Sequence, residues 1–344
     1  MTYNLASHKS LLAMSATVCA FAFAPAAQAK ANFITFHPPN DSAVYSVVGI
    51  SDHGVIAGSY DDNVGYAHGF LRAADGTYTI FDPTNSVETL VHGMNNKGAT
   101  VGFYYNPNVA DFGFVRSPNG KIVDIVYPGA KTSTTVAVAI NDVDVIVGTY
   151  IDGATGYIIG FVRYGSQNLQ SIQVSGTAGN TYPSGINAGG VITGSYANSN
   201  DNVSHGFVRD AGGVVTTFDY PGSDATYAMG INVGGEITGY YASGGNEHGF
   251  LRSADGATFT SIDVPEGVGG TVATCINSEG DVAGFYEILG GGDAGGFVRR
   301  ASGTIKTFGP SKDKGIVPGG INSHGAIAGT TYPGGAERGF LRSR

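Results

Sequence analysis

TTFDYPGSDATYAMGINVGGEITGYYASGGNEHGFLRSADG, residues 216–256, is one copy of a unit that recurs along the whole chain. Three landmarks identify a copy: Ile or Met followed by Asn and, three residues after the Asn, Gly; Gly-x-Tyr; and Gly-Phe-(Leu or Val)-Arg. The third landmark ends at Arg72, Arg116, Arg163, Arg209, Arg252, Arg299 and Arg342, which makes seven copies. A period of this length is typical of propeller blades and solenoid repeats.

Within a copy, short runs rich in β-branched and aromatic residues alternate with turn residues. TYAMGI ends at an Asn-x-x-Gly turn, EITGYY and HGFLR follow, and a copy closes on a strand such as VVTTFD. Helix signals are missing. The capping repeats of a solenoid would be more polar than the rest, whereas here the first and last copies are no more polar than the middle ones. The sequence therefore predicts an all-β fold: a single closed β-propeller of seven four-stranded blades.

The order of the strands predicts how the ring closes. The strand ending in Gly-Ile-Asn carries the smallest residues and should be innermost, so the chain starts on an outermost strand (33–37) and stops on a third strand (339–342). We expect the N-terminal strand to complete the last blade, which hides both sheet edges. The predicted propeller spans 30–344, with units of about 30–76, 77–120, 121–167, 168–213, 214–256, 257–303 and 304–344.

Residues 1–29 are predicted to be a signal peptide. Lys9 precedes an apolar run from Leu11 to Ala24, and Ala27-Gln28-Ala29 matches a cleavage site, so we expect cleavage after Ala29 and a secreted or periplasmic protein. Removing 29 of the 344 residues leaves 315, which is 45 per copy. Cys275 is then the single cysteine, so no internal disulfide can form.

Composition excludes some partners. The formal charge is −9, and loss of Lys9 with the signal peptide makes it −10, which disfavours nucleic acid. No other apolar run is long enough for a membrane span, and a monomer is expected. Glycine, at 55 residues, fits tight turns and closely packed strands.

Three copies carry a histidine before Gly-Phe and an aspartate after the fourth strand. The pairs are His68 with Asp82, His205 with Asp219, and His248 with Asp263. Their spacing places each pair on facing strands of one hairpin. A structural pair in each hairpin is the favoured interpretation, because an active site needs one copy and not three; a histidine general base oriented by the aspartate is the alternative. The seven arginines are likewise predicted to be structural, donating to carbonyls of the Asn-x-x-Gly turns.

Binding residues are expected where the two longer loops of every copy open on one face, here called the long-loop face. The candidates are of two kinds, Gly-x-Tyr tyrosines and polar loop residues: Tyr60, Tyr196, Tyr241, Asp201, Asn202, Asn246 and Glu247. The tyrosines can alternatively pack between blades with the hydroxyl at the rim.

An enzyme would depart from the repeat. His92 stands where the other copies carry Val, Ser, Met, Thr or Gly, on a predicted innermost strand, with Glu88 and Glu287 as acidic companions. These are the candidate catalytic residues; a packed core histidine is the competing interpretation. No zinc cluster or phosphate loop is found, and no cofactor is expected, although Asp61-Asp62-Asn63 and 198–202 offer oxygen ligands for Ca²⁺.

The repeats resemble the HAF-repeat family of extracellular bacterial proteins, named for a His-Ala-Phe triplet. Here the triplet reads His-Gly-Phe at 68–70, 205–207 and 248–250, and the likeness extends to Gly-Ile-Asn and Gly-x-Tyr in all seven copies. Gly replaces Ala in every triplet, and four copies lack the His. The resemblance implies a repeat fold and export, but no activity or catalytic residues.

Two functions follow as hypotheses. The first is an extracytoplasmic binding or scaffold protein that meets a polysaccharide, an envelope component or a protein on its long-loop face. The second is a polysaccharide-degrading lyase or hydrolase with its site at the mouth of the channel, an analogy with other propellers.

Overall fold

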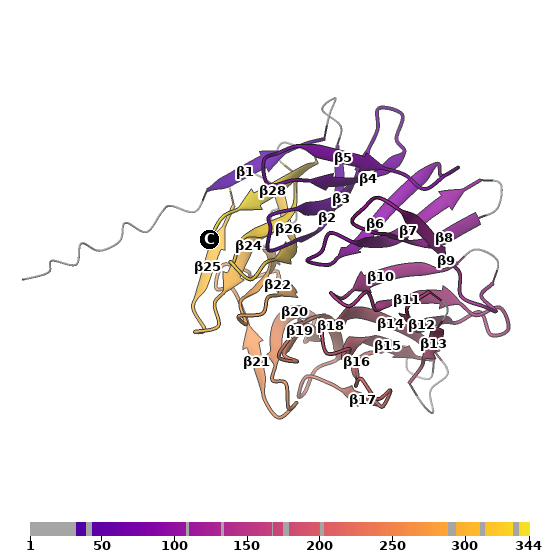
Figure 1. Ribbon diagram of the computed structural model, residues 1–344. Coiled ribbons are helices and arrows are strands. Elements are labelled where there is room, and N and C mark those ends of the chain that lie inside the picture. The colour runs from indigo at the N-terminus through magenta and orange to yellow at the C-terminus, as the bar shows by residue number, and fades with distance from the viewer. Residues whose placement is uncertain are drawn as a thin grey trace, which may run out of the picture. The chain divides into compact units, whose positions relative to one another are not determined.

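The structure is a computed structural model that describes residues 32–38, 43–107, 110–131, 134–166, 168–174, 179–199, 203–287, 294–309, 314–332 and 337–344. The predicted signal peptide lies outside these residues. Seven four-stranded antiparallel sheets surround one axis (Figure 1), so the predicted seven-bladed all-β propeller is confirmed. Among the described residues no helix occurs, and hence none that could cross a membrane.

Every blade has the same strand order from the axis outward. The innermost strands are β2 (Val44–Ile50), β6 (Glu88–Met94), β10 (Val136–Ile140), β14 (Gly179–Ile186), β18 (Ala225–Ile231), β22 (Gly270–Ile276) and β26 (Lys314–Ile321). The second strands are β3 (Ile56–Asp61), β7 (Thr100–Asn106), β11 (Ile146–Ile151), β15 (Ile192–Asn198), β19 (Ile237–Ser243), β23 (Val282–Glu287) and β27 (Ile327–Tyr332).

The outer half of each blade carries the third and fourth strands. The third strands are β4 (Ala67–Arg72), β8 (Ala110–Arg116), β12 (Ile158–Tyr164), β16 (Ser204–Arg209), β20 (Asn246–Arg252), β24 (Ala294–Arg299) and β28 (Arg338–Arg342). The outermost strands are β5 (Tyr78–Phe81), β9 (Ile122–Ile125), β13 (Asn168–Ile172), β17 (Val215–Phe218), β21 (Phe259–Ile262), β25 (Ile305–Phe308) and, in the last blade, β1 (Phe33–Phe36).

Strand β1 closes the ring as predicted. It pairs with β28, from Phe33 opposite Arg342 to Phe36 opposite Gly339. The Phe33 ring stacks on Phe340 at a centroid distance of 5.2 Å, and Phe36 is buried against the first blade. The last blade is therefore built from both ends of the propeller chain.

The core of each blade is the phenylalanine of Gly-Phe-x-Arg. These seven rings have no exposed surface: Phe70, Phe114, Phe161, Phe207, Phe250, Phe297 and Phe340. The glycine of Gly-x-Tyr is needed beside them, since a Cβ at Gly102 would collide with the Leu90 carbonyl oxygen and touch the Phe114 ring. The repeat motif is thus a packing rule for one blade.

Candidate functional site

The two faces of the ring have different construction. The Asn-x-x-Gly turns surround one mouth of the channel, which holds a cavity of about 420 Å³ lined by the last residues of the seven innermost strands. The opposite, long-loop face carries the first residues of the innermost strands, the loops between second and third strands, and the connections between blades (Figure 1).

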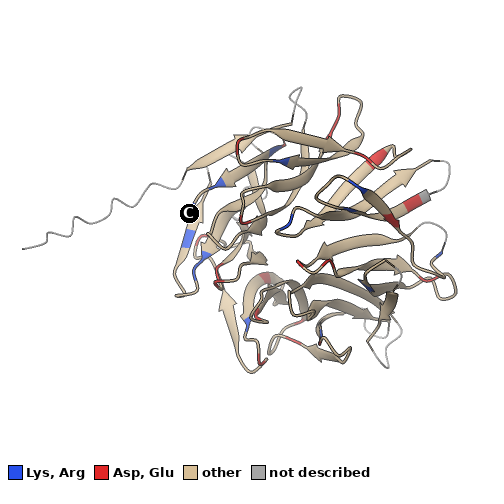
Figure 2. Ribbon diagram, viewed as in Figure 1, with Lys and Arg blue, Asp and Glu red and all other residues tan. Residues whose placement is uncertain are grey.

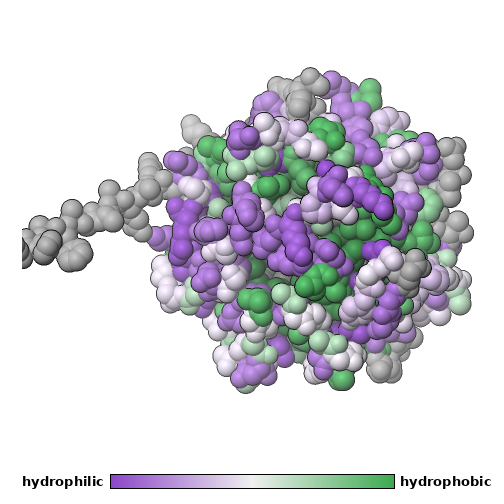
Figure 3. All heavy atoms as spheres, in the orientation of Figure 1, coloured by the Kyte–Doolittle hydropathy of each residue, from purple (hydrophilic) through white to green (hydrophobic). Residues whose placement is uncertain are grey.

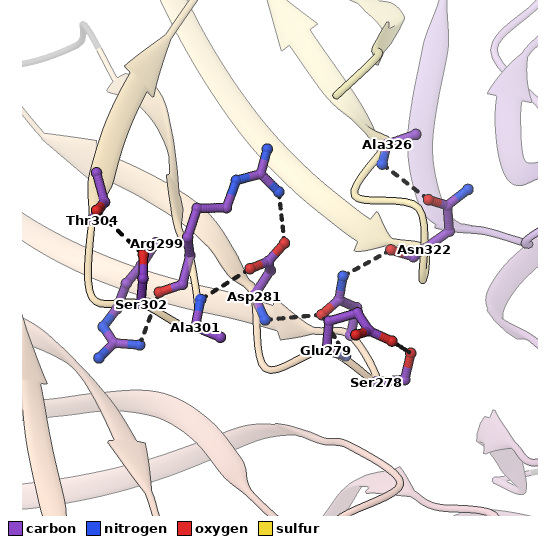
Figure 4. Close-up of polar contacts among 11 residues, drawn as sticks. Ser278, Glu279, Asp281, Arg299, Ala301, Ser302, Thr304, Asn322 and Ala326 are labelled. Atoms are coloured by element: carbon purple, nitrogen blue, oxygen red, sulfur yellow. Dashed lines mark hydrogen bonds and ion pairs between the residues drawn. The ribbon is translucent and has the colours of Figure 1, made fainter. Parts of the chain in front are cut away.

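Asparagine side chains join neighbouring blades around the tight-turn mouth. Each Nδ2 donates to the backbone carbonyl of the equivalent residue in the next blade at 2.9–3.1 Å, in the pairs Asn95–Asn141, Asn141–Asn187, Asn187–Asn232, Asn277–Asn322 and Asn322–Ser51. The Oδ1 of each of these five donor asparagines accepts from a backbone N–H of its own turn, as that of Asn322 does from Ala326 N–H (Figure 4). The turn was predicted, but the bond between blades was not.

The circle is interrupted at two seams. Ser51 stands in place of Asn in the first blade, and Asn232 donates instead to the Glu236 carboxylate at 2.7 Å. The polar groups at this mouth are therefore used mainly in hydrogen bonds that join neighbouring blades, which indicates a structural role for this face.

The arginines have a structural environment that differs from the predicted one. The Nη1 atoms of Arg72, Arg116, Arg209 and Arg299 lie 3.4 Å from the carbonyl of the following residue, not at the Asn-x-x-Gly turns. In four seams the guanidinium lies 4.6–4.9 Å from the centroid of a phenylalanine in the preceding blade: Arg72 on Phe36, Arg116 on Phe81, Arg252 on Phe218 and Arg342 on Phe308. Such cation–π contacts stabilise a seam because both groups are largely withdrawn from water.

The three histidine–aspartate pairs lie within hydrogen-bonding distance. The Nδ1 atom is 2.9 Å from Asp82 in His68, 3.0 Å from Asp219 in His205 and 2.7 Å from Asp263 in His248. In the first pair, Asp62 also lies 3.4 Å from His68 Nε2. Burial alone lowers the pKa of His68, but Asp82 and then Asp62 outweigh it, so the pKa is raised.

The three Gly-x-Tyr tyrosines singled out from sequence lie against these histidines. Ring centroids are 5.4 Å apart for Tyr60–His68 and 5.1 Å apart for Tyr196–His205 and Tyr241–His248. Tyr241 is also stacked on Tyr220 at 3.6 Å and is buried. A sugar-stacking role for Tyr241 is therefore wrong, because its ring is covered by other rings.

Exposed tyrosines occur elsewhere on the long-loop side. Tyr45 is 52% exposed, Tyr105 41% and Tyr182 40%, and they come from β2, β7 and β14. Tyr227 and Tyr240 add a stacked pair at 4.6 Å in the fifth blade. The sequence analysis missed all five tyrosines, because they are not conserved landmarks of the repeat. Their alternation with buried residues along the innermost and second strands could have indicated that they are exposed.

His92 lies at a β-bulge of the innermost strand β6, between Val91 and Gly93. Its side chain is exposed, so the interpretation as a packed core histidine is wrong, although protein surrounds it closely enough to lower the pKa of the imidazole. Its ring makes an edge contact with Phe103 at 5.4 Å. Glu88 lies four residues away along the extended strand, roughly 13 Å, so the two do not form a catalytic pair.

Glu287 instead lies close to Glu247, a residue predicted for ligand binding. Glu247 is the second residue of β20 in one blade and Glu287 ends β23 of the next, and the adjacent Gly270 and Gly269 lie against Glu247 and Glu287 respectively. Burial and then the Glu287 charge raise the pKa of Glu247. Exposed Asn246 lies beside them, whereas Asp201 and Asn202 lie outside the described residues.

The same arrangement recurs at the seam between the last and first blades. Glu337 precedes β28 and Asp61 ends β3, the positions equivalent to Glu247 and Glu287. Burial and then Asp61 raise the pKa of Glu337, and burial and then Asp62 raise that of Asp61. The long-loop face thus carries paired carboxylates at two seams. In the view of Figure 2, charged residues are few and dispersed over the blades.

The loop at residues 61–63, which was predicted to offer oxygen ligands for Ca²⁺, uses its central carboxylate in other contacts. The Asp62 carboxylate accepts from Val64 N–H and Tyr66 N–H at 2.9 Å and lies beside His68, so both of its oxygens have protein partners. Among the described residues no group of three or more His, Cys, Asp or Glu could hold a metal ion. Part of the second run, 198–202, lies outside them.

Comparison with known proteins supports the fold. No protein family and no curated protein matches the chain. Among solved structures it is similar to a streptogramin B lyase (TM-score 0.60, 13% identity, covering 91% of this chain and 98% of that one). It is also similar to the virginiamycin B lyase of Staphylococcus aureus (TM-score 0.56, 14%, 91% and 99%) and, over 86% of this chain and 52% of the other, to a puromycin hydrolase (0.55, 12%). At these identities the likeness shows a propeller fold and nothing more.

Proposed function

We propose that this protein is an extracytoplasmic binding protein whose long-loop face takes a hydroxyl-rich ligand, a polysaccharide of the envelope or its surroundings. The exposed tyrosines Tyr45, Tyr105 and Tyr182 carry the proposal, because an exposed aromatic ring offers an apolar face to a sugar and a hydroxyl to its rim. Carboxylates on the same face, such as that of Glu247, can accept hydrogen bonds from hydroxyl groups. Rings on separate blades suit a ligand with several residues, bound by many weak contacts.

Figure 3 shows hydrophobic and hydrophilic side chains interspersed over the face that it presents. Export rests on the predicted signal peptide, and the resemblance to the HAF-repeat proteins points the same way.

The test is a binding screen of the mature chain, residues 30–344, against envelope and plant polysaccharides, with wild type beside Tyr45→Ala and Tyr182→Ala. Each variant should weaken binding without abolishing it. The matched control is Val143→Ala, an exposed residue of a tight turn on the opposite face. Unchanged binding in both tyrosine variants would contradict the proposal.

A second candidate function is a lyase or hydrolase acting on a polysaccharide. The observation that favours it is the Glu247–Glu287 pair, because two close carboxylates with one raised pKa can divide acid and base roles. Exposed His92, whose pKa is lowered, offers a neutral imidazole as an alternative base. Product release by wild type, lost in Glu247→Gln or His92→Ala, would favour the enzyme over the binding protein.

A further inference from the structure

Three seams carry an isoleucine where the other four carry the phenylalanine that contacts the arginine, and a cleft lies at one of these three. The outermost strands end in Phe or Ile: Phe36, Phe81, Ile125, Ile172, Phe218, Ile262 and Phe308. Between the third and fourth blades, Ile172 stands where a phenylalanine supports the arginine at four other seams. Beside Ile172 lies a cleft of about 540 Å³, lined by residues of β13 and of the turn that joins β16 to β17. That volume is in the range of small-molecule sites.

The lining of this cleft is polar and contains one cation. Gln170, Ser171 and Gln173 come from β13 and its end, residues 212–215 from the opposite turn, and Arg209 lies between them. Only 6% of Arg209 is exposed. Its Nη1 donates to the Tyr164 hydroxyl at 3.2 Å and its Nη2 to Gln170 Oε1 at 3.3 Å, so amide and hydroxyl groups hold the guanidinium at the cleft.

Arg209 has no carboxylate partner among the residues that the structure describes. Within the described residues, the arginine that forms an ion pair with a carboxylate is Arg300, whose partner is Asp281. The neighbouring Asp210 turns its Oδ1 to Val214 N–H at 2.8 Å, inside its own turn. A largely buried guanidinium bounded by neutral groups favours an anion, and its planar fork matches a carboxylate.

We propose that this cleft is a binding site for an acidic sugar of the uronate type. Arg209 pairs with the sugar carboxylate, while Gln170, Gln173 and Ser171 exchange hydrogen bonds with its hydroxyls. The site is separate from the long-loop face: it lies on the outer half of two blades, toward the tight turns. It adds recognition of an anion to an otherwise acidic protein.

The decisive variant is Ile172→Phe, which restores the ring found at four seams and fills the cleft without removing Arg209. The seam between the sixth and seventh blades shows that a phenylalanine is compatible with the fold at this position, because Phe308 occupies the equivalent position there. Pro318, opposite Gly329, is the counterpart of Pro183, opposite Gly194. Ile262→Phe, at the equivalent position of another seam, is the matched control. Thermal melting checks that both variants fold, because a larger side chain at a fully buried position costs about 1–3 kcal/mol where it has no space.

The experiment is calorimetric titration of the mature chain with D-glucuronate and, as the uncharged comparison, D-glucose. Wild type and Ile262→Phe should bind glucuronate alike and glucose at least about tenfold more weakly, since the charge-assisted bonds to Arg209 are lost. Ile172→Phe should weaken glucuronate binding at least about tenfold while polysaccharide binding at the long-loop face is kept. Absence of glucuronate binding to wild type, equal binding of glucose, or full binding by folded Ile172→Phe would overturn the proposal.

Discussion

Removal of the N-terminal strand tests the closure of the ring. Deleting residues 31–38 takes β1 from the last blade and leaves the edge of β28 unpaired. Phe36 is 6% exposed and lies 4.9 Å below the Arg72 guanidinium. Truncating a buried phenylalanine alone costs about 3–5 kcal/mol. The deletion also removes the Phe33–Phe340 stack, so we expect a loss of at least that size.

Urea denaturation of the mature chain, followed by intrinsic tyrosine fluorescence and circular dichroism, measures this loss. Phe36→Ala should reproduce most of it within the intact chain, whereas Ile34→Ala on the same strand, 44% exposed, should change the midpoint little. The deletion is also expected to aggregate through the open edge. An unchanged midpoint in the deletion variant would refute closure by β1.

Further predictions concern single side chains. Replacing His205 or Asp219 should cost about 0.5–1.5 kcal/mol, since half of the Asp219 side chain is exposed, and the double variant clearly less than the sum; strict additivity in this cycle would show that the pair does not interact. The raised pKa of His68 means that its charged form adds stability in full below about pH 6.5 and loses it as the pH rises through the folded-state pKa; His68→Gln should flatten that part of the stability curve. Burial raises the pKa of the partly exposed Cys275 to about 12, so a thiol reagent should label it far more slowly in the native protein than after unfolding; equally rapid labelling of both would contradict this. Asn141→Ala, which removes one bond between blades and two turn bonds, should lower the midpoint more than Asn232→Ala, whose Nδ2 stays within its own turn.

The fold could be predicted from the sequence because each repeat landmark specifies a local structure. Gly-Phe-x-Arg supplies a buried ring, and Asn-x-x-Gly supplies a turn whose glycine has positive φ, as in Gly98. Because the repeats start on an outermost strand and stop on a third strand, the N-terminal strand could be predicted to complete the last blade. Contacts between blades were not readable, since the Asn95–Asn141 bond and the Arg72–Phe36 stack join residues about one repeat apart.

The candidate site was predicted only in part. The hairpin geometry of His68 and Asp82 follows from their spacing, but the cover on Tyr241 comes from Tyr220 in the connection between blades. Glu247 and Glu287 were named separately, and their proximity depends on how two blades pack. Non-repeating residues on loops and strand ends carry no periodic signal, so their placement required the three-dimensional fold.

The central claim is that exposed tyrosines on the long-loop face bind a polysaccharide. Equilibrium binding of the Tyr45→Ala/Tyr182→Ala double variant, measured against the tightest polysaccharide of the screen, tests it most directly. We predict at least about tenfold weaker binding at an unchanged melting temperature, since two stacking surfaces are lost, and wild-type binding by Val143→Ala. Wild-type affinity in the double variant, or no polysaccharide bound by the wild type, would contradict the claim.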